Sequence, residues 1–413
     1  MPKSTKTASA RRAPTACFDT IKHIDTIATP TYLTVAQRND FDMARSFLEA
    51  YTGSLGTFNS YRRDVERLLQ WTWQIENKIL EDLKREDIEA FVSFCQKPPA
   101  AWIGIKKAPR FKIIDGTRMP NPEWRPFVAT VSKSAFKKGQ LPEKASYTPS
   151  NGSIKELLAI IGSFFQYLQL EEYTASNPVA LIRQKNKFVQ KRQGHTTVRR
   201  LSTQQWQMVI DTAEQLAEED PVNHERTLFM ISALYGMYLR ISELGANDRW
   251  TPTMNDFHKD HEGLWWFTTV GKGNKERQIA VSDAMLAALK RWRKFQGLSA
   301  LPTPADNAPL FPLQRGKGPL VDTTHIRKII QTCFNRAIDN LCEQGLNEDA
   351  DSMMDATVHW LRHTGISDDV QRRPREHVRD DAGHSSSAIT DRYVDIELKE
   401  RHKSAKRKDF RRD

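Results

Sequence analysis

Two histidines and an arginine lie within five positions of one short stretch, HWLRHTGIS, at residues 359–367. Structural segments rarely need so much imidazole and guanidinium. Residues three apart are neighbours on a helix, so His359 and Arg362 would share one face and reach the same ligand. Trp360 and Leu361 would point elsewhere and anchor the turn in a core. An arginine beside a histidine suits a phosphate, because the guanidinium binds its oxygens and the imidazole moves protons.

Three other stretches carry residues of the same chemical kinds. They are LRISEL at 239–244, GKGNKER at 271–277 and GHSSSAITDRY at 383–393. Each has an ordinary structural explanation when it is taken alone: an Arg–Glu pair on an amphipathic helix, a basic hairpin tip, and a half-buried tyrosine. Together with the HWLRH stretch they supply two arginines, two or three histidines, a lysine on a turn and a tyrosine. We interpret the combination as the parts of one site.

Phosphoryl transfer at a DNA phosphodiester is the reaction that this set of side chains fits. Negative charge grows on the two non-bridging oxygens in the transition state, so cations must be in place there in advance. Arginine suits this task better than lysine. The leaving 5′ oxygen also needs an acid, and the phosphorus needs a nucleophile. The sequence shows no EF-hand loop, zinc-ligand spacing or paired-carboxylate motif, so we expect the cations to take the place of metal ions, with no metal site and no cofactor.

The composition favours a nucleic-acid partner over a membrane. The 413 residues suffice for two domains, each with its own core. The net charge of +11 and the isoelectric point of about 9.4 favour a polyanion, of which nucleic acid is the commonest. No apolar run approaches the roughly 18 residues of a membrane span, and the N-terminus lacks a secretory apolar stretch. The cysteines show no metal or disulfide spacing, which favours a reducing, cytoplasmic setting; they are Cys17, Cys95, Cys333 and Cys342.

The first half of the chain is expected to be a helical domain. Residues 1–40 have the composition of a flexible basic arm that leads into the first helix. Amphipathic helices are predicted from Ser54, through SLGTFNSYRRDVERLLQW, and from Ser153, through SIKELLAIIGSFFQYLQ. Arg62 and Arg63 lie away from the apolar face of the first of these helices. They either contact DNA phosphates or belong to a solvated face.

Two further segments of this half are unusual. Residues 96–150 are rich in proline and form a long insertion that either contacts DNA or covers the core. Residues 183–200, RQKNKFVQKRQGHTTVRR, carry seven Lys or Arg residues and no acid. This segment is either a solvated linker between domains or a strap along a DNA backbone, where each cation displaces condensed counterions. We favour the strap, and its candidate DNA contacts are Lys191, Arg192, Arg199 and Arg200.

From residue 201 the pattern predicts a mostly helical domain with a small antiparallel sheet. Helices are expected at 203–218, 225–246, 282–296 and 323–340. Strands at 264–270 and 277–281 flank a glycine-rich turn. The GKGNKER stretch is therefore predicted to form the tip of a β-hairpin.

The four stretches resemble, in type, order and approximate spacing, the motifs of the tyrosine recombinase (phage integrase) family. The likeness covers roughly residues 45–95 and 151–398 and is stronger in the second segment. LRISEL is similar to the first arginine motif of the family, which implies that Arg240 clamps the scissile phosphate and Glu243 supports the site. GKGNKER resembles the hairpin that carries the general acid, which places that role on Lys272 rather than on Lys275.

The other two stretches imply the remaining roles. HWLRH resembles the H-x-x-R motif, so His359 would be the acid/base partner and Arg362 the second clamp. His363 also follows the family pattern, as a supporting residue. AGH resembles the next motif and gives His384 as a further phosphate ligand. Tyr393, nine residues beyond it, lies where the family has its nucleophile.

The resemblance also implies a fold that is mainly α with a small antiparallel β-sheet, arranged as a two-domain, C-shaped clamp. The expected parts are an arm at 1–40, a helical SAM-like core-DNA-binding domain at 41–182 with the insertion at 96–150, a linker at 183–200, a catalytic domain at 201–398 and a basic tail at 399–413. The chain departs from the family at Tyr238, where a glycine is usual. It departs again in the charged segment before His384, which Pro374 interrupts, so the helix that carries this histidine is expected to be set differently.

The implied function is site-specific recombination that integrates and excises a mobile element through a 3′-phosphotyrosyl intermediate. The implied partners are double-stranded DNA recombination sites, further copies of the chain in a tetramer on two duplexes, and accessory DNA-bending or directionality proteins. No membrane partner is expected, and the expected location is the cytoplasm, at the bacterial nucleoid. One alternative is a DNA-relaxing enzyme of the type IB topoisomerase kind, which needs no partner duplex. Another is a non-catalytic DNA-binding regulator, but such a protein has no chemical reason to retain the whole set of residues.

Overall fold

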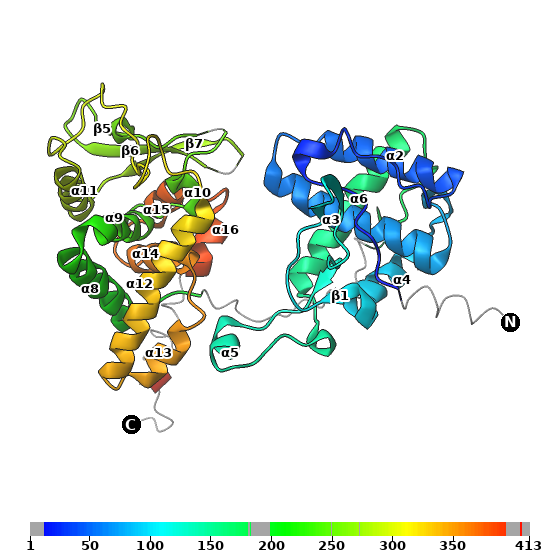
Figure 1. The fold of residues 1–413 in the computed structure, drawn as a ribbon. Helices are drawn as coiled ribbons and strands as arrows, with labels where there is room; N and C mark the ends of the chain where they lie inside the picture. The colour runs from blue at the N-terminus through cyan, green and yellow to red at the C-terminus, as the bar shows by residue number, and fades with distance from the viewer. Residues whose placement is uncertain are drawn as a thin grey trace, which may run out of the picture. The chain divides into compact units, whose positions relative to one another are not determined.

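The computed structural model describes residues 12–180, 182, 199–248, 250–271, 273–393 and 405–406. The chain divides into two compact units, residues 1–193 and 194–413, and the division falls inside the segment predicted to be a linker. Both units consist mainly of helices with small sheets, as the sequence predicts (Figure 1). Among the residues that the structure describes, no helix is both long and apolar enough to cross a membrane.

Four long helices enclose the core of the first unit. They are α2 (Val35–Glu49), α3 (Leu55–Trp71), α4 (Arg85–Gln96) and α6 (Asn151–Leu170). Their apolar faces meet in a core rich in aromatic rings, among them Phe41, Phe47, Phe58, Phe91, Phe164 and Phe165. Helices α3 and α6 confirm the two predicted amphipathic helices. The N-cap of α6 is Ser150 rather than Ser153, because the Ser150 hydroxyl accepts the Ser153 backbone N–H at 3.1 Å.

Residues 12–34 also belong to this unit, so the prediction of a flexible arm at 1–40 is wrong for that part. Cys17 and Phe18 are buried, and the Phe18 ring stacks on that of Phe41 with 4.9 Å between centroids. The backbone N–H of Phe18 donates to a carboxylate oxygen of Glu66 at 3.2 Å. The segment includes one short helix, η1 (Ile21–His23). The segment is mostly basic and polar, so its composition gave no sign of the few apolar residues that pack into the core.

The proline-rich insertion covers the core, which is one of the two alternatives that the sequence left open. Trp102 and Phe127 are fully buried in it, and the guanidinium of Arg67 lies 4.5 Å from the centre of the Phe127 ring. The short elements here and just before it are η2 (Thr72–Glu76), η3 (Leu80–Asp82), η4 (Ala100–Trp102), β1 (Ile103–Gly104), β2 (Phe111–Ile114), β3 (Thr117–Pro120), β4 (Phe127–Val128), α5 (Lys133–Lys137) and η5 (Lys144–Ser146). Strands β1 and β4 pair in parallel, and β2 and β3 form an antiparallel hairpin.

The second unit is built on helices of very different lengths. They are α8 (Thr203–Glu219), α9 (Pro221–Gly236), α10 (Ile241–Leu244), α11 (Asp283–Phe295), α12 (Thr323–Glu343), α13 (Asn347–Met353), α14 (Val358–Asp369), α15 (Arg375–Ala382), α16 (Ser387–Thr390), and the single turns η6 (Met254–Asp256) and η7 (Asp391–Tyr393). Three of the four predicted helices are confirmed by α8, α11 and α12. Figure 1 shows α14 and α15 between α9 and α12, with the sheet at one end of the unit.

The sheet of this unit is an antiparallel meander of three strands. Strands β6 (Trp265–Val270) and β7 (Glu276–Ala280) confirm the predicted hairpin, and β5 (Phe257–Lys259) is an edge strand that the sequence did not indicate. Val270 pairs with Glu276, so the turn between β6 and β7 carries residues 271–275. The GKGNKER stretch therefore forms the hairpin tip and the first residues of β7.

The predicted helix at 225–246 is wrong in its second half. Helix α9 ends at Gly236, and Tyr238 adopts a left-handed conformation with φ 51°. A residue with a side chain rarely takes this conformation unless its surroundings hold it there. Here the Tyr238 ring is fully buried and its hydroxyl donates to Asp369. The turn places Arg240 at the N-cap of the separate helix α10.

Helix α14 packs against α9 at one very close approach. A Cβ atom added to Gly365 would lie 2.1 Å from the backbone carbonyl oxygen of Tyr235. Only glycine allows the two helix backbones to come this near. The contact fixes the axial position of α14, which carries the HWLRH stretch.

Candidate active site

The first predicted arginine, Arg240, is held at the start of α10 by Glu243. The carboxylate of Glu243 is 1% exposed and accepts the Arg240 backbone N–H at 2.8 Å and its Nη1 at 2.9 Å. Nη2 of Arg240 lies 3.5 Å from the carbonyl oxygen of Gly383. The side chain of Arg240 is 28% exposed, so its guanidinium is fastened at one edge and open to solvent elsewhere.

Arg277 binds the same carboxylate from the other side. Its Nη1 and Nη2 donate to the two Glu243 oxygens at 2.9 and 2.8 Å, and its Nε donates to the carbonyl oxygen of Asp381 at 2.9 Å. Burial alone would raise the pKa of Glu243, but the hydrogen bonds and charge of Arg277, with the backbone N–H and charge of Arg240, lower it. Glu243 is therefore an anion that holds two arginines.

The second predicted arginine, Arg362, projects from α14 and is 2% exposed. Its Nη1 donates to the backbone carbonyl of Tyr238 and its Nη2 to that of Ala382, the latter at 2.6 Å. Burial, and next the charge of Arg240, lowers the pKa of Arg362 to about 9, so the side chain is still a cation at neutral pH. The left-handed turn at Tyr238 thus supplies an oxygen that positions this arginine.

Two histidine rings contact the Tyr393 side chain, and a third lies behind one of them. Nδ1 of His363 lies 2.5 Å from the Tyr393 hydroxyl oxygen. The His384 ring is stacked on the Tyr393 ring with 5.7 Å between centroids, and the His359 ring meets that of His363 edge to face at 4.2 Å. Tyr393 itself is 6% exposed. Two of the four sequence stretches, HWLRH and GHSSSAITDRY, therefore meet at one phenol.

These rings are neutral at neutral pH because burial disfavours the imidazolium form. Burial, and next the neighbouring His359, lowers the pKa of His363 to about 3. Burial, and next the charge of Arg362, lowers the pKa of His384 to about 4. The pKa of His359 is lowered by burial and by the charges of Arg362 and Arg240. A neutral imidazole has one ring nitrogen that can accept a proton.

The segment that carries His384 ends in a tight cap. Pro374 precedes the first residue of α15, where a missing N–H costs nothing, so it starts this helix rather than breaking it. Gly383 follows α15 in the left-handed conformation, with φ 63°, and the backbone N–H of His384 donates to the carbonyl of Arg379 at 3.1 Å. His384 Nδ1 lies 2.9 Å from the hydroxyl oxygen of Thr390.

The predicted residues outside this cluster are placed as follows. Lys272, the predicted general acid, lies outside the described residues, as do Lys191 and Arg192. Gly271, which directly precedes Lys272, is described, and a Cβ atom added to it would lie 3.3 Å from Nη1 of Arg240. The hairpin tip that carries the lysine therefore starts beside the first arginine. Lys272 stays a prediction.

The candidate DNA contacts of the first unit have protein partners. Arg62 is 8% exposed, and its guanidinium donates to the backbone carbonyl of Asp19 and, at 2.7 Å, to the side-chain oxygen of Asn59. The expectation that it faces solvent is wrong, because residues 12–34 cover it. Arg63 is 36% exposed and pairs with Asp64 at 2.7 Å.

At the start of the second unit, Arg199 is exposed and the Arg200 side chain is 30% exposed, 3.9 Å from a carboxylate oxygen of Asp368. Both remain open to a ligand. Their role in DNA binding stays a prediction.

Sequence reasoning missed Arg277, the carbonyl of Tyr238 and the hydroxyl of Thr390. Arg277 lies inside the quoted GKGNKER stretch, and the pairing of the two predicted strands could have placed it on the hairpin. The other two could not be found, because a backbone carbonyl and a threonine carry no distinctive pattern. Among the described residues, no three His, Cys, Asp or Glu side chains converge as a metal site would require.

Comparison with known proteins assigns this unit to a family. Residues 199–400 match the model of the phage integrase family. The matched segment therefore resembles a phage integrase domain. The matched range begins before Arg240 and ends after Tyr393, so it contains all four predicted stretches.

One curated relative and two solved structures extend the likeness over more of the chain. The tyrosine recombinase XerC of Thermodesulfovibrio yellowstonii is 24% identical over 269 residues, which are 63% of this chain and 77% of the relative. The XerH site-specific recombinase in a post-cleavage complex with its palindromic difH substrate matches with a TM-score of 0.55 at 14% identity, over 93% of this chain and 92% of that one. Its pre-cleavage complex gives a TM-score of 0.50 at 15% identity, over 92% of both chains. The two structures show that the chain has the fold of a two-domain tyrosine recombinase.

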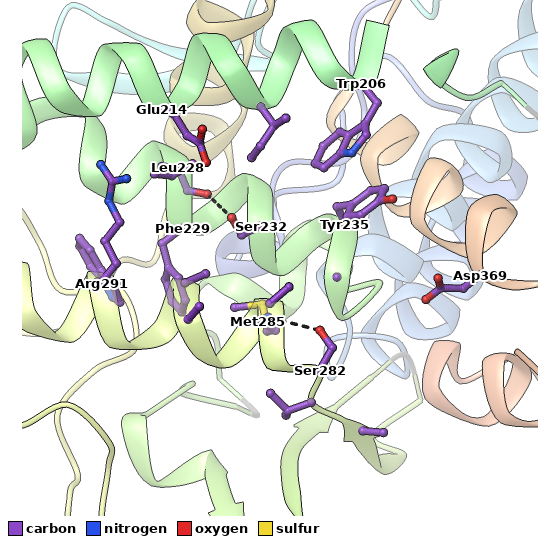
Figure 2. Close-up of a pocket in the computed structure, with 18 of the residues that line it drawn as sticks. Trp206, Glu214, Leu228, Phe229, Ser232, Tyr235, Ser282, Met285, Arg291 and Asp369 are labelled. Atoms are coloured by element: carbon purple, nitrogen blue, oxygen red, sulfur yellow. Dashed lines mark hydrogen bonds between the residues drawn. The ribbon is translucent and has the colours of Figure 1, made fainter. Parts of the chain in front are cut away.

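The integrase domain also contains a groove of about 890 Å³ that lies apart from this site. Figure 2 shows it between α8, α9 and α11, with Trp206 and Tyr235 at one end and Arg291 at the other. The Trp206 and Tyr235 rings are stacked 3.8 Å apart. Among the described residues, neither Tyr393 nor the arginines and histidines of the candidate site line the groove, so the groove is separate from that site.

Proposed function

We propose that the protein is a site-specific DNA recombinase that integrates and excises a mobile element by cutting and rejoining strands through a 3′-phosphotyrosyl intermediate. The observation that carries the proposal is that His363 and His384 contact Tyr393 within the segment that matches the phage integrase model, with His359 and two arginines in the same cluster. Positive charge beside a buried phenol is suited to a phosphodiester, whose transition state is more anionic on its equatorial oxygens than the ground state.

The two arginines bind the non-bridging oxygens of the scissile phosphate. Arg362 is fastened to two backbone carbonyls and Arg240 to Glu243, so neither has to be ordered when DNA arrives. Preorganised donors of this kind contribute most of the electrostatic stabilisation in phosphoryl transfer. His384, whose ring is stacked on that of Tyr393, is a further ligand of the phosphate.

The hydroxyl oxygen of Tyr393 attacks phosphorus, and the bond from phosphorus to the 5′ oxygen breaks. Lys272 protonates the departing 5′ oxygen, and His359 serves as acid/base partner at the scissile phosphate. A 5′ hydroxyl of a second duplex then attacks the phosphotyrosyl bond, which restores the tyrosine and joins the exchanged strands. The phosphotyrosyl bond retains the energy of the phosphodiester bond that was broken, so the cycle needs no nucleotide hydrolysis.

The XerH neighbours are recombinases in complex with difH substrate, before and after cleavage. By analogy, the partners of this chain are double-stranded recombination sites and three further copies of itself in a tetramer on two duplexes. Accessory DNA-bending or directionality proteins would set the direction of exchange. The site of action is the cytoplasm, at the bacterial nucleoid, where the DNA lies.

Backbone contacts in this complex come from Arg63, Arg199 and Arg200 and, in the segment that connects the units, from Lys191 and Arg192. The basic net charge of +11 supports such sequence-independent binding. Arg62 is better explained as a structural residue of the first unit, because its partners there are Asp19 and Asn59.

Trapping a covalent adduct tests the proposal. The wild type, Tyr393→Phe and Tyr235→Phe are incubated with labelled duplex fragments tiled across the ends of the host element, each nicked so that the released 5′ hydroxyl fragment diffuses away. Label that stays with the wild type and with Tyr235→Phe under denaturation, but not with Tyr393→Phe, supports strand cleavage by Tyr393. Tight binding without an adduct in any variant contradicts it and favours a regulator. Relaxed plasmid without exchanged strands favours a topoisomerase.

A further inference from the structure

The contact between His363 and Tyr393 has no counterpart in the roles proposed above, which leave the proton of the tyrosine unassigned. A phenol has an unperturbed pKa near 10, so an attack at neutral pH needs a group that removes this proton. We propose that His363 is the general base that takes the proton from Tyr393 during strand cleavage and returns it during rejoining. The inference rests on the proposed function and deepens it.

Geometry is the first support. Nδ1 of His363 and the Tyr393 hydroxyl oxygen are 2.5 Å apart, a short hydrogen-bond distance and close enough for direct proton transfer. The two rings come from segments 30 residues apart, α14 and η7, and both are largely buried. The histidine is fixed by the packing of α14 against α9 at Gly365, two positions further on.

The second support is the state of the imidazole. Four groups face this ring: His359 and Arg362 from its own helix, His384 from the segment after α15, and Tyr393 from η7. Burial, and next His359 and Arg362, keeps the imidazole neutral, so a ring nitrogen can accept a proton. The same surroundings weaken the imidazole as a base, so the transfer depends on the negative charge that the bound phosphate brings to the site. With the hydrogen on Nε2, Nδ1 faces the phenol as an acceptor.

The third support is the position of His359. Its ring meets His363 edge to face, 4.2 Å away, while the His363 ring is the one hydrogen-bonded to the phenol. The two histidines of the HWLRH stretch therefore have different partners. His363 serves the nucleophile, and His359 is left for the phosphate and the leaving group.

The step balances without a further reactant. The Tyr393 O–H bond breaks and its proton goes to Nδ1 of His363, while the phenol oxygen forms a bond to phosphorus. The bond from phosphorus to the 5′ oxygen breaks, and that oxygen takes a proton from Lys272. In the reverse step the imidazolium returns its proton to the phenol oxygen as the phosphotyrosyl bond breaks. The imidazolium forms next to Arg362, and the negative charge on the phosphate offsets their repulsion.

Two substitutions separate a base from a residue that only positions the phenol. His363→Ala removes both functions, and the single-turnover cleavage rate is expected to fall by about 10²- to 10⁴-fold, the usual contribution of a general base. His363→Asn keeps a side-chain oxygen near the place of Nδ1, so it still accepts the phenol hydrogen bond, but an amide cannot take the proton. If His363 is the general base, both variants should cleave equally slowly. If His363 only positions the phenol, His363→Asn should cleave at close to the wild-type rate. Unchanged DNA affinity and unfolding temperature show that each variant is folded.

Chemical rescue gives the sharpest readout. A fluorinated tyrosine incorporated at 393 has a more acidic phenol and needs less help from a base, so it should restore cleavage by His363→Ala at least tenfold. A substrate with sulfur in place of the bridging 5′ oxygen has a leaving group that needs no acid, and it should not rescue His363→Ala. Lys272→Ala is the matched control, for which the expected pattern is the reverse.

Rescue of His363→Ala by the sulfur substrate, or a wild-type cleavage rate in His363→Ala, would overturn the inference. Both results leave the proposed function intact, because the wild type still forms its adduct. Failure of the wild type to form an adduct on any substrate would instead contradict the proposed function itself.

Discussion

Glu243 and Arg277 form a two-point ion pair in which each nitrogen at the end of the guanidinium lies less than 3 Å from one carboxylate oxygen, at 2.9 and 2.8 Å. The pair joins α10 to the first residues of β7. Through its Nε, Arg277 also binds the carbonyl of Asp381, just before the turn that carries His384. One buried ion pair therefore connects two of the four sequence stretches that form the site, and its arginine also binds the chain just before a third.

Replacing Arg277 by alanine should lower the free energy of unfolding of the catalytic unit by about 3 kcal/mol, because a buried carboxylate loses its main partner. Arg277→Lys should recover little of this, since a lysine cannot bind two oxygens and a carbonyl at once. Denaturant unfolding measures both variants. Arg291→Ala, which breaks a partly exposed ion pair with Glu225, is the control and should cost no more than about 1 kcal/mol. Equal losses at Arg277 and Arg291 would show that the central pair has no special role.

Replacing Gly365 by alanine should separate α14 from α9. The added Cβ would lie 2.1 Å from the Tyr235 carbonyl oxygen, so the helix must shift, with Arg362 and His363 on it. We expect a loss of roughly 1–3 kcal/mol or more in stability, the usual effect of overpacking, and a cleavage rate reduced together with it. Gly56→Ala in α3 is the matched control: nothing lies within 4 Å of its added Cβ, and a small gain in stability is expected. If Gly365→Ala behaved like Gly56→Ala, the close approach of the helices would not be required.

The stability of the catalytic unit should fall as the pH drops below about 6.5. His363 and His384 have folded-state pKa values of about 3 and 4, below the value of about 6.5 in an unfolded chain. The unfolded chain therefore binds more protons between these limits, and protonation favours it. The contribution is complete above pH 6.5 and declines progressively down to about pH 4 for His384 and about pH 3 for His363. Unfolding temperatures measured from pH 8 to pH 4 should show this decline, and His363→Asn should make it shallower; a parallel decline in the variant would contradict the prediction.

Arg62 and Arg200 should differ in how they affect DNA binding. Arg62 is buried by Asp19 and Asn59, so Arg62→Ala should destabilise the first unit and leave the salt dependence of DNA affinity unchanged. Arg200 is 30% exposed, and Arg200→Ala should weaken binding to all sequences and reduce the slope of log affinity against log salt by about 1. Titrations at several salt concentrations measure the slopes. The same slope for wild type and Arg200→Ala would remove this residue from the DNA contacts.

Much of the architecture could be predicted because it depends on patterns of many residues. Apolar periodicity placed α3, α8, α11 and α12, and alternation with a glycine-rich turn placed the β6–β7 hairpin. The four motif stretches indicated the site because their arginines, histidines and tyrosine together suit phosphate chemistry and resemble the motifs of the tyrosine recombinase family. The structure then brings Arg240, Arg362, His359, His363, His384 and Tyr393 together.

What could not be predicted depends on single long-range contacts. Tyr238 is left-handed only because a buried ring and Asp369 hold it there, so nothing local marks the end of α9. Phe18 joins the core through Phe41 and Glu66, which lie far away in a sequence that otherwise has the composition of a flexible arm. The hydrogen bond between His363 and Tyr393 spans 30 positions, and the motif alone indicates no more than a supporting role for that histidine.

The central claim is that the hydroxyl of Tyr393 forms the bond to DNA. The most direct measurement is mass spectrometry of the trapped adduct after nuclease and trypsin digestion. Cleavage after Arg392 and Lys399 releases the peptide of residues 393–399, or residues 380–399 if the modified tyrosine blocks the first cut. The account predicts that this peptide carries the mass of a phosphodeoxynucleotide on Tyr393. A nucleotide on any other residue, or an adduct with an unmodified Tyr393 peptide, would contradict it.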